Sequence, residues 1–186
     1  MEFFGTAMAV EQISKHGVLV ADPNQNMVTL VGTMLRGLGR RDIREANDAG
    51  RAMRELRRRI FDVIIIDDAL DGLDGVAFTR QLRASEDNQN RLTPVIMMSA
   101  APDAKRIAAA RDAGVTEFLR KPFAANHLQT RLTSIEANPR GFIVEADYNG
   151  PDRRRKTVEE LTEGERRTRP ATTLTVTPDS EPAKTA

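Results

Sequence analysis

The chain has 186 residues, a net charge of +1 from 28 lysines and arginines against 27 aspartates and glutamates, and no cysteine. A charge so close to zero argues against a body that binds nucleic acid, and the lack of cysteine excludes disulfides and thiolate chemistry. We find no run of about 18 apolar residues that would cross a membrane and no basic start typical of a signal peptide, so we expect a cytoplasmic protein.

The first part of the chain combines an apolar run with an amphipathic segment. Residues 1–15 are expected to form a flexible arm. The stretch Gly17–Ala21 (GVLVA) predicts a buried strand that ends at a carboxylate, Asp22, and Pro23 then stops the strand. The apolar residues that follow recur with helical spacing, at Met27, Leu30, Val31, Met34, Leu35 and Leu38.

A second strand and helix follow in the same pattern. Ile43–Ala46 predicts a short strand at an edge of a sheet, and Asp48 is a good N-cap for the helix after it. The apolar stripe of that helix consists of Ala49, Ala52, Met53, Leu56 and Ile60.

The most informative stretch is Phe61–Gly75 (FDVIIIDDALDGLDG). Val63–Ile66 is an unbroken apolar run without polar alternation, which is typical of a strand covered on both faces in a parallel α/β sheet. The run ends at Asp67, at the carboxyl end of the strand, where open α/β sheets place their ligand sites. Gly72 and Gly75 then turn the chain into the next helix.

The remaining segments continue the alternation of strand and helix. Helices are predicted over residues 76–84, 102–113 and 125–136. Two further strands are predicted, Pro94–Ser99, which ends in a hydroxyl, and Glu117–Leu119, which is followed by Lys121. A pattern of five β–α units predicts a parallel sheet with helices on both faces and right-handed crossovers.

Four chemically active side chains are expected at one edge of this sheet: Asp22, Asp67, Ser99 and Lys121. Two neighbouring carboxylates repel each other unless a cation intervenes, and Mg²⁺ is the usual cation where phosphate is also bound. A carboxylate can itself attack phosphorus and form an aspartyl phosphate. A hydroxyl and an ammonium would then bind the phosphoryl oxygens.

With these residues the chain resembles the receiver domain of bacterial response regulators, of the chemotaxis type. The motifs that carry the resemblance are VLVAD, DVIIID with the later Asp-Gly pair, PVIMMSA and FLRKPF, in that order between about Gly17 and Glu136. The resemblance implies a doubly wound, five-stranded parallel sheet with strand order 2-1-3-4-5. It predicts a receiver domain over residues 16–137.

The resemblance also implies a role for each site residue. Asp67 matches the phosphoryl acceptor. Asp22, Asp67 and the backbone carbonyl of Ala69 match the Mg²⁺ contacts. The other matches are Ser99 as the switch hydroxyl, Phe118 as the switch aromatic, Lys121 as the phosphate-binding lysine, and Lys121-Pro122 as a cis peptide bond.

Three residues depart from the family pattern. Pro23 occupies the position of a second acidic residue, which should weaken Mg²⁺ binding. Asp71 stands where a proline is common. Asp68 directly follows the acceptor, and we expect its side chain to point elsewhere because adjacent strand residues face opposite sides of a sheet.

The favoured hypothesis is a response regulator of a two-component phosphorelay, not an enzyme, that receives a phosphoryl group from a histidine kinase or phosphotransfer protein. A downstream protein would bind the face formed by the fourth helix, fifth strand and fifth helix. The alternatives are a phosphorylation-independent binding module, suggested by Pro23, and a nucleic-acid regulator acting through Arg153–Lys156.

Residues 138–186 are expected to form a largely disordered, charged tail, because from Gly150 onward the composition is rich in charge, proline and threonine. DNA is an unlikely partner for this tail. Useful affinity for duplex DNA takes roughly 6–10 phosphate contacts, and the four cations of Arg153–Lys156 are followed by several glutamates.

Overall fold

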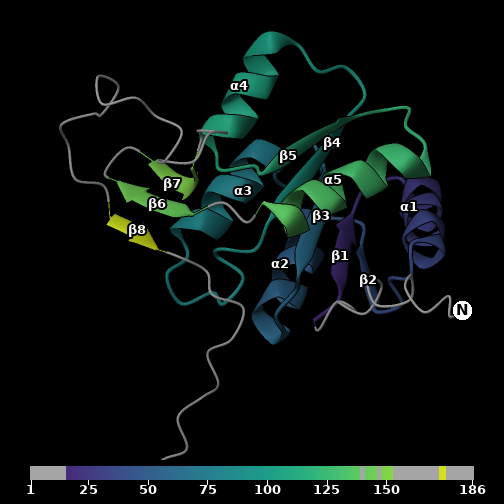
Figure 1. Cartoon of the computed structure of the whole chain (residues 1–186), viewed down its shortest axis with the longest axis horizontal. Helices are drawn as coiled ribbons and strands as arrows, with labels where there is room; N and C mark the ends of the chain where they lie inside the picture. The colour runs from purple at the N-terminus through teal and green to yellow at the C-terminus, as the bar shows by residue number, and fades with distance from the viewer. Residues whose placement is uncertain (1–15, 139–140, 146–147, 153–171, 175–186) are drawn as a thin grey trace, which may run out of the picture.

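The computed structural model describes residues 16–138, 141–145, 148–152 and 172–174 (Figure 1). Strands and helices alternate through the first ten elements, and three short strands follow. In chain order the elements are β1 (Val18–Ala21), α1 (Gln25–Gly37), β2 (Ile43–Ala46), α2 (Ala49–Arg58), β3 (Val63–Asp67), α3 (Gly75–Ala84), β4 (Val95–Ser99), α4 (Ala104–Asp112), β5 (Glu117–Arg120), α5 (Ala125–Ala137), β6 (Phe142–Glu145), β7 (Tyr148–Pro151) and β8 (Thr172–Leu174).

The first five strands form one parallel sheet in the order β2-β1-β3-β4-β5, which confirms the expected strand order. Every residue of β1, β3 and β4 is buried, as the unbroken apolar runs predict. Because all five strands run the same way, their carboxyl ends lie along one edge of the sheet, and this edge carries Asp22, Asp67 and Ser99.

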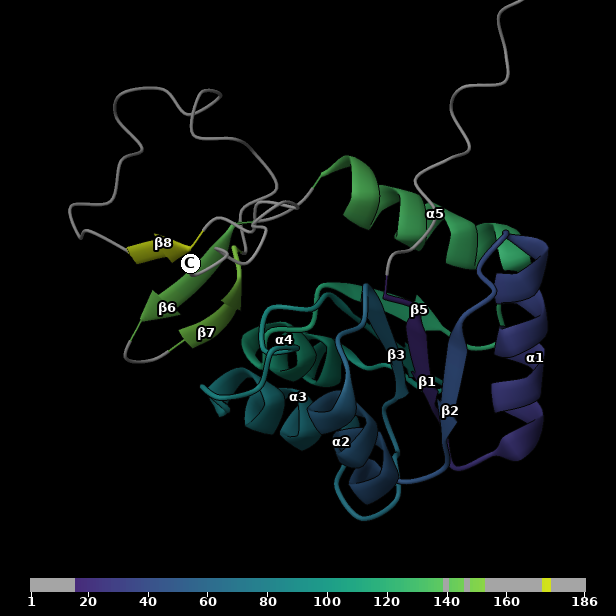
Figure 2. The same cartoon turned by 90° about the horizontal axis from the view of Figure 1, so that it is seen from below.

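Helices cover both faces of the sheet. Helices α1 and α5 pack on one face, where Val28, Leu35 and Leu128 join the alternate residues of the strands. Helices α2, α3 and α4 cover the other face, as Figure 2 shows. The two faces therefore bury separate hydrophobic clusters, which gives the doubly wound α/β fold. Among the residues that the structure describes, no helix has the length and apolar character to span a membrane.

The last three strands form a small antiparallel sheet in the order β7-β6-β8. These strands lie within residues 138–186, which were expected to be largely disordered; Phe142 and Tyr148 are buried, and β7 lies against α3 (Figure 1). Residues 1–15 and the Arg153–Lys156 run lie outside the described residues.

Candidate functional site

Two carboxylates and one ammonium meet at the carboxyl edge of the parallel sheet. Asp22 follows β1, Asp67 ends β3, and Lys121 follows β5. The Nζ of Lys121 donates to the Oδ2 of Asp22 at 2.6 Å and also to the Oδ2 of Asp67. All three side chains are largely buried, with exposed fractions of 1% for Asp22, 10% for Asp67 and 16% for Lys121. The structure thus brings together three of the predicted site residues.

The ammonium of Lys121 compensates part of the two negative charges. Burial of Lys121 disfavours its charged form, but the hydrogen bonds that it donates to Asp22 and Asp67, together with the negative charges of these carboxylates, outweigh that effect and raise the pKa of Lys121 above its ordinary value. The lysine therefore stays protonated at neutral pH. A fixed cation at this position can bind an anionic group that arrives at Asp67.

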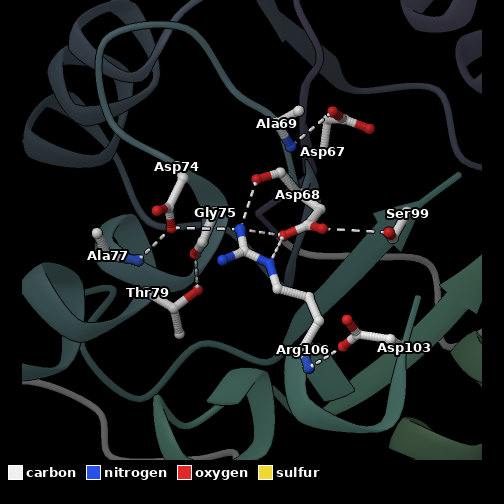
Figure 3. Close-up of polar contacts among 10 residues, drawn as sticks. All are labelled: Asp67, Asp68, Ala69, Asp74, Gly75, Ala77, Thr79, Ser99, Asp103 and Arg106. Carbon is white, nitrogen blue, oxygen red and sulfur yellow. Dashed lines mark hydrogen bonds and ion pairs between the residues drawn. The ribbon is translucent and has the colours of Figure 1, made fainter. Parts of the chain in front are cut away.

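The backbone after β3 holds Asp67 in place. The Oδ1 of Asp67 accepts a hydrogen bond from the backbone N–H of Ala69 at 2.9 Å. The N–H of Gly75 donates to the carbonyl of Asp68 at 3.0 Å. Asp74 caps α3 by accepting from the N–H of Ala77 at 2.9 Å, as Figure 3 shows. The later Asp-Gly pair of the motif is thus the start of α3, packed against the end of β3.

Gly75 has to be glycine because the backbone of β3 approaches it closely. A Cβ at this position would lie 2.7 Å from the carbonyl oxygen of Asp67 and 3.1 Å from the Cα of Asp68. Neither backbone atom can move aside without displacing Asp67 itself. The glycine of the motif therefore sets how closely α3 can pack beside Asp67.

Ser99, the predicted switch hydroxyl, has a partner that the sequence did not predict. Ser99, which is buried at the end of β4, donates from its Oγ to the Oδ2 of Asp68 at 3.1 Å. The Nε of Arg106, on α4, donates to the Oδ1 of Asp68 at 2.6 Å, and its Nη2 donates to the Asp68 carbonyl at 3.1 Å. As Figure 3 shows, Asp68 turns toward Ser99 and Arg106, not toward the contacts of Asp67.

Arg106 links three parts of the site. Its Nη2 also lies 3.5 Å from the Oδ1 of Asp74, the cap of α3. The hydrogen bond to Asp68 raises the pKa of the Arg106 guanidinium above its ordinary value, despite partial burial. No sequence pattern marks Arg106, because it lies in an alanine-rich helix 38 residues after its partner. A carboxylate at position 68, directly after the predicted acceptor, was the one sequence signal for this contact.

Two further predicted features lie on β5 and just beyond it. Phe118 is half-buried and packs against the hydrophobic cluster beneath α2, α3 and α4. The peptide bond between Lys121 and Pro122 is cis, as the resemblance implied. Phe118 thus packs against the same hydrophobic cluster to which Ala110 of α4 belongs.

The oxygen atoms at this edge fit a hard divalent cation. Asp22 and Asp67 hydrogen-bond to the same ammonium, so their carboxylates lie close enough to share a cation, and carboxylate and carbonyl oxygens are the ligands that Mg²⁺ prefers. Pro23 supplies no side-chain oxygen, and among the described residues no cluster of three acidic, histidine or cysteine side chains occurs. The residues present therefore fit Mg²⁺ with two carboxylates, and they leave the other positions to the backbone carbonyl that the resemblance implies, that of Ala69, and to water or phosphate.

A comparison with sequence models of protein families identifies the family of this chain. A sequence model of the response regulator receiver domain matches residues 18–133, well over half of the chain. The chain therefore belongs to the response regulator receiver family, whose members act in two-component signalling.

The chain is similar to proteins of several bacteria. It is 31% identical to chemotaxis protein CheY-3 of Vibrio cholerae over 118 residues, which is 63% of this chain and 89% of that protein. It is 37% identical to the KDP operon transcriptional regulatory protein KdpE of Escherichia coli over 115 residues, 62% of this chain but only 48% of KdpE. The similarity to KdpE therefore covers about half of that longer protein.

Solved structures give the same fold. The receiver domain of the sensor histidine kinase PA1611 from Pseudomonas aeruginosa, with a magnesium ion in its active-site cleft, is 31% identical, with a TM-score of 0.59 over 66% of this chain and 98% of that one. A response regulator from Chloroflexus aurantiacus, described as putative, is 27% identical with a TM-score of 0.61 over 66% of this chain and 98% of that one.

Proposed function

We propose that this receiver accepts a phosphoryl group on Asp67 from a histidine kinase or a phosphotransfer protein. The observation that carries the proposal is the placement of Asp67 beside both Asp22 and the Lys121 ammonium, at the carboxyl edge of the sheet. A carboxylate oxygen of Asp67 would attack the phosphorus, the bond to the donor nitrogen would break, and an acyl phosphate would form. Lys121 would then pair with the phosphoryl oxygens.

Mg²⁺ is the proposed cofactor, held by Asp22, Asp67 and the carbonyl of Ala69. When bound, it would offset the charge of the incoming phosphoryl group. The chain's own contribution is to hold Asp67, through the Ala69 N–H, and to keep a cation at Lys121. Support for the metal comes from the oxygen ligands and from the magnesium ion in the PA1611 receiver structure.

The output would be contact with a downstream protein, in the cytoplasm, through the face of α4, β5 and α5. A hollow of about 490 Å³ lies on this face between β5 and α5. Its lining residues are Leu119, Arg120, Lys121, Pro122, His127, Thr130 and Arg131. Because Lys121 belongs to both the site and this hollow, a new phosphoryl partner for Lys121 would alter the surface that the partner binds.

The test is intact mass after incubation with a small phosphodonor and Mg²⁺. Wild-type protein should gain one phosphoryl group, and Asp67→Asn should gain none, because the amide is not a nucleophile toward phosphorus. Asp68→Asn is the matched control at the neighbouring carboxylate, and it should still be phosphorylated. A mass gain that persists in Asp67→Asn would refute the assignment.

The outcome also separates this proposal from the alternative of a phosphorylation-independent module, which the missing acid at Pro23 suggests. A wild-type protein that stays unmodified with both a small phosphodonor and a phosphorylated histidine kinase would support the alternative. The DNA hypothesis depends on Arg153–Lys156, outside the described residues, and no contact in the described part of the chain favours it.

A further inference from the structure

The hydroxyl of Ser99 is bound to a carboxylate other than the proposed acceptor. Its Oγ donates to Asp68, as Figure 3 shows. The two carboxylate oxygens of Asp67 accept instead from the Ala69 N–H and the Lys121 ammonium. A serine hydroxyl has a single O–H to donate. Ser99 therefore cannot donate to Asp68 and to a phosphoryl oxygen on Asp67 at the same time.

Asp68 is held firmly in this position. Its N–H donates to the carbonyl of Met98 on β4 at 2.8 Å, and its carbonyl accepts from Gly75. Its carboxylate and its carbonyl both accept from one guanidinium, that of Arg106. The exposed fractions are 16% for the side chain of Asp68 and 31% for that of Arg106, so solvent screens the ion pair only in part.

The guanidinium also connects the site to α4. Arg106 lies in the first turn of that helix, where its own N–H donates to the capping Asp103 at 2.6 Å. Its side chain reaches back to Asp68 and to Asp74, the cap of α3. A movement of Ser99 toward Asp67 would leave the Asp68 carboxylate with one donor fewer, and Arg106 on α4 would have to adjust to that change.

We propose that Asp68 and Arg106 form a latch that holds the Ser99 hydroxyl away from Asp67 and thereby opposes the phosphorylated arrangement. The proposal rests on the proposed function, since it needs a phosphoryl group on Asp67. Asp68 is the competing acceptor, and Arg106 positions it. Both are positioning residues, because neither contacts the reacting atoms. The latch ties the release of Ser99 to a change at α4, on the proposed output face.

The test is the affinity for beryllofluoride, a stable phosphoryl mimic, in the presence of Mg²⁺, followed by backbone amide NMR. Asp68→Ala should bind beryllofluoride about tenfold more tightly than wild type, because one charge-assisted hydrogen bond of the free state no longer has to be broken. Amide signals of α4 in free Asp68→Ala should also be displaced toward their positions in the bound wild type. Asp68→Asn keeps a hydrogen-bond acceptor but loses the charge, so its affinity for beryllofluoride should lie between those of wild type and Asp68→Ala.

Two controls separate the latch from simple removal of a negative charge. Asp71→Ala removes an exposed carboxylate from the same loop between β3 and α3, and it should change the affinity for beryllofluoride much less. In a Ser99→Ala background, Asp68→Ala should change the affinity for beryllofluoride much less, because no Ser99 hydroxyl remains for which Asp68 and beryllofluoride compete. An equal gain with and without the Ser99 hydroxyl would overturn the latch and leave only charge repulsion.

The design also distinguishes a failed latch from a failed function. Beryllofluoride binding of equal affinity by wild type and Asp68→Ala overturns the latch and leaves the acceptor role of Asp67 intact. Binding by Asp68→Ala alone supports a latch strong enough to suppress the wild type. If neither protein binds beryllofluoride or takes a phosphoryl group, both proposals are wrong.

Discussion

At the residue scale, Lys121 has the clearest energetic role, because it is the cation shared by Asp22 and Asp67. We predict that Lys121→Gln lowers the free energy of unfolding by about 2 kcal/mol in metal-free buffer, since it leaves two largely buried carboxylates facing each other. Added Mg²⁺ should restore more stability to the variant than to wild type. Urea denaturation with and without Mg²⁺ measures both effects.

The pH dependence of this loss follows from the raised pKa of Lys121. A group whose pKa is higher in the folded state stabilises the fold below its unfolded value, here 10.5, and that contribution disappears as the pH rises through the folded value. The difference between wild type and Lys121→Gln should therefore be constant from about pH 7 to 9 and shrink above about 10.5. Arg120→Gln, an exposed neighbour with the same change of charge, should show no such difference.

Pro23 is the second residue-scale determinant, because it replaces a carboxylate next to Asp22. We predict that Pro23→Asp tightens Mg²⁺ binding by about tenfold, since a third carboxylate near the cation adds both charge and a ligand. Mg²⁺ titration of the amide signals around Asp67 measures this. Asn24→Asp is the matched control, because it adds the same charge one residue later, at the cap of α1. Equal gains in the two variants would mean that position 23 does not face the metal.

At the element scale, the connection between β3 and α3 depends on Gly75, because a side chain at this position would collide with the backbone of β3. We predict that Gly75→Ala destabilises the protein by about 2 kcal/mol, because its Cβ would press on the Asp67 carbonyl, and overpacking of this kind costs roughly 1–3 kcal/mol. Phosphorylation of Asp67 should also slow, as the acceptor is displaced. Chemical denaturation and intact mass against time measure the two effects.

A glycine elsewhere provides the control for this prediction. Gly37, at the end of α1, has open space where a Cβ would lie. Gly37→Ala should leave stability unchanged or raise it slightly, because alanine is the better helix former. If both substitutions proved neutral, α3 would not be packed against β3 as closely as described.

The strands and helices that could be predicted from the sequence are those marked by a pattern among neighbouring residues, such as an apolar run or a helix cap. Val63–Ile66 has no polar alternation, and β3 is buried on both faces. Asp48 precedes an apolar stripe and caps α2 by accepting from the N–H of Arg51 at 2.7 Å. The strand order came from the resemblance, because no periodicity within a strand specifies its neighbour in a sheet.

The interactions that could not be predicted join residues far apart in the sequence. Arg106 meets Asp68 across 38 residues, and Arg83 on α3 reaches the carbonyl of Gly114 across 31. In both helices the arginine follows no pattern that distinguishes it from a solvated residue. Only the packing of α3 and α4 in the fold decides that one arginine binds Asp68 and the other is fully buried.

At the scale of the whole molecule, the hairpin of β6 and β7 is an addition to the receiver fold that packs against it. The ring of Phe142 lies 5.5 Å from the guanidinium of Arg83, which donates to the carbonyls of Gly114 and Arg91. Burial lowers the pKa of Arg83 to about 10. Because Arg83 stays charged at neutral pH, its burial costs free energy and opposes the docking of the hairpin. The hydrogen bonds and the aromatic ring offset that cost.

Backbone packing brings the hairpin close to the body. A Cβ on Gly150 would lie 2.7 Å from the Cα of Gly114 and 2.5 Å from the Oη of Tyr148. The hydroxyl of Tyr148 donates to the carbonyl of Pro151, at the other end of β7, at 2.6 Å. Glycine at position 150 is therefore what allows β7 to reach the turn between α4 and β5.

We predict that a chain ending at Asn138 unfolds at a temperature roughly 5 °C lower than the full chain. Burial of Phe142 and Tyr148 contributes about 4 kcal/mol, and the desolvation of Arg83 reduces the net gain to about 2 kcal/mol, which corresponds to this shift. A chain ending at Asp152 keeps β6 and β7 and should unfold within about 2 °C of the full chain. Calorimetry of the three proteins measures the shifts.

Gly150→Ala in the full chain tests the same docking without any deletion. Its Cβ would force β7 away from Gly114, so its unfolding temperature should approach that of the chain ending at Asn138. The hairpin and α4 would also become easier to separate, which amide exchange in α4 and β7 would register as faster exchange. If the chain ending at Asn138 were as stable as the full chain, the hairpin would contribute nothing to the receiver, and its place beside α3 and α4 would need another explanation.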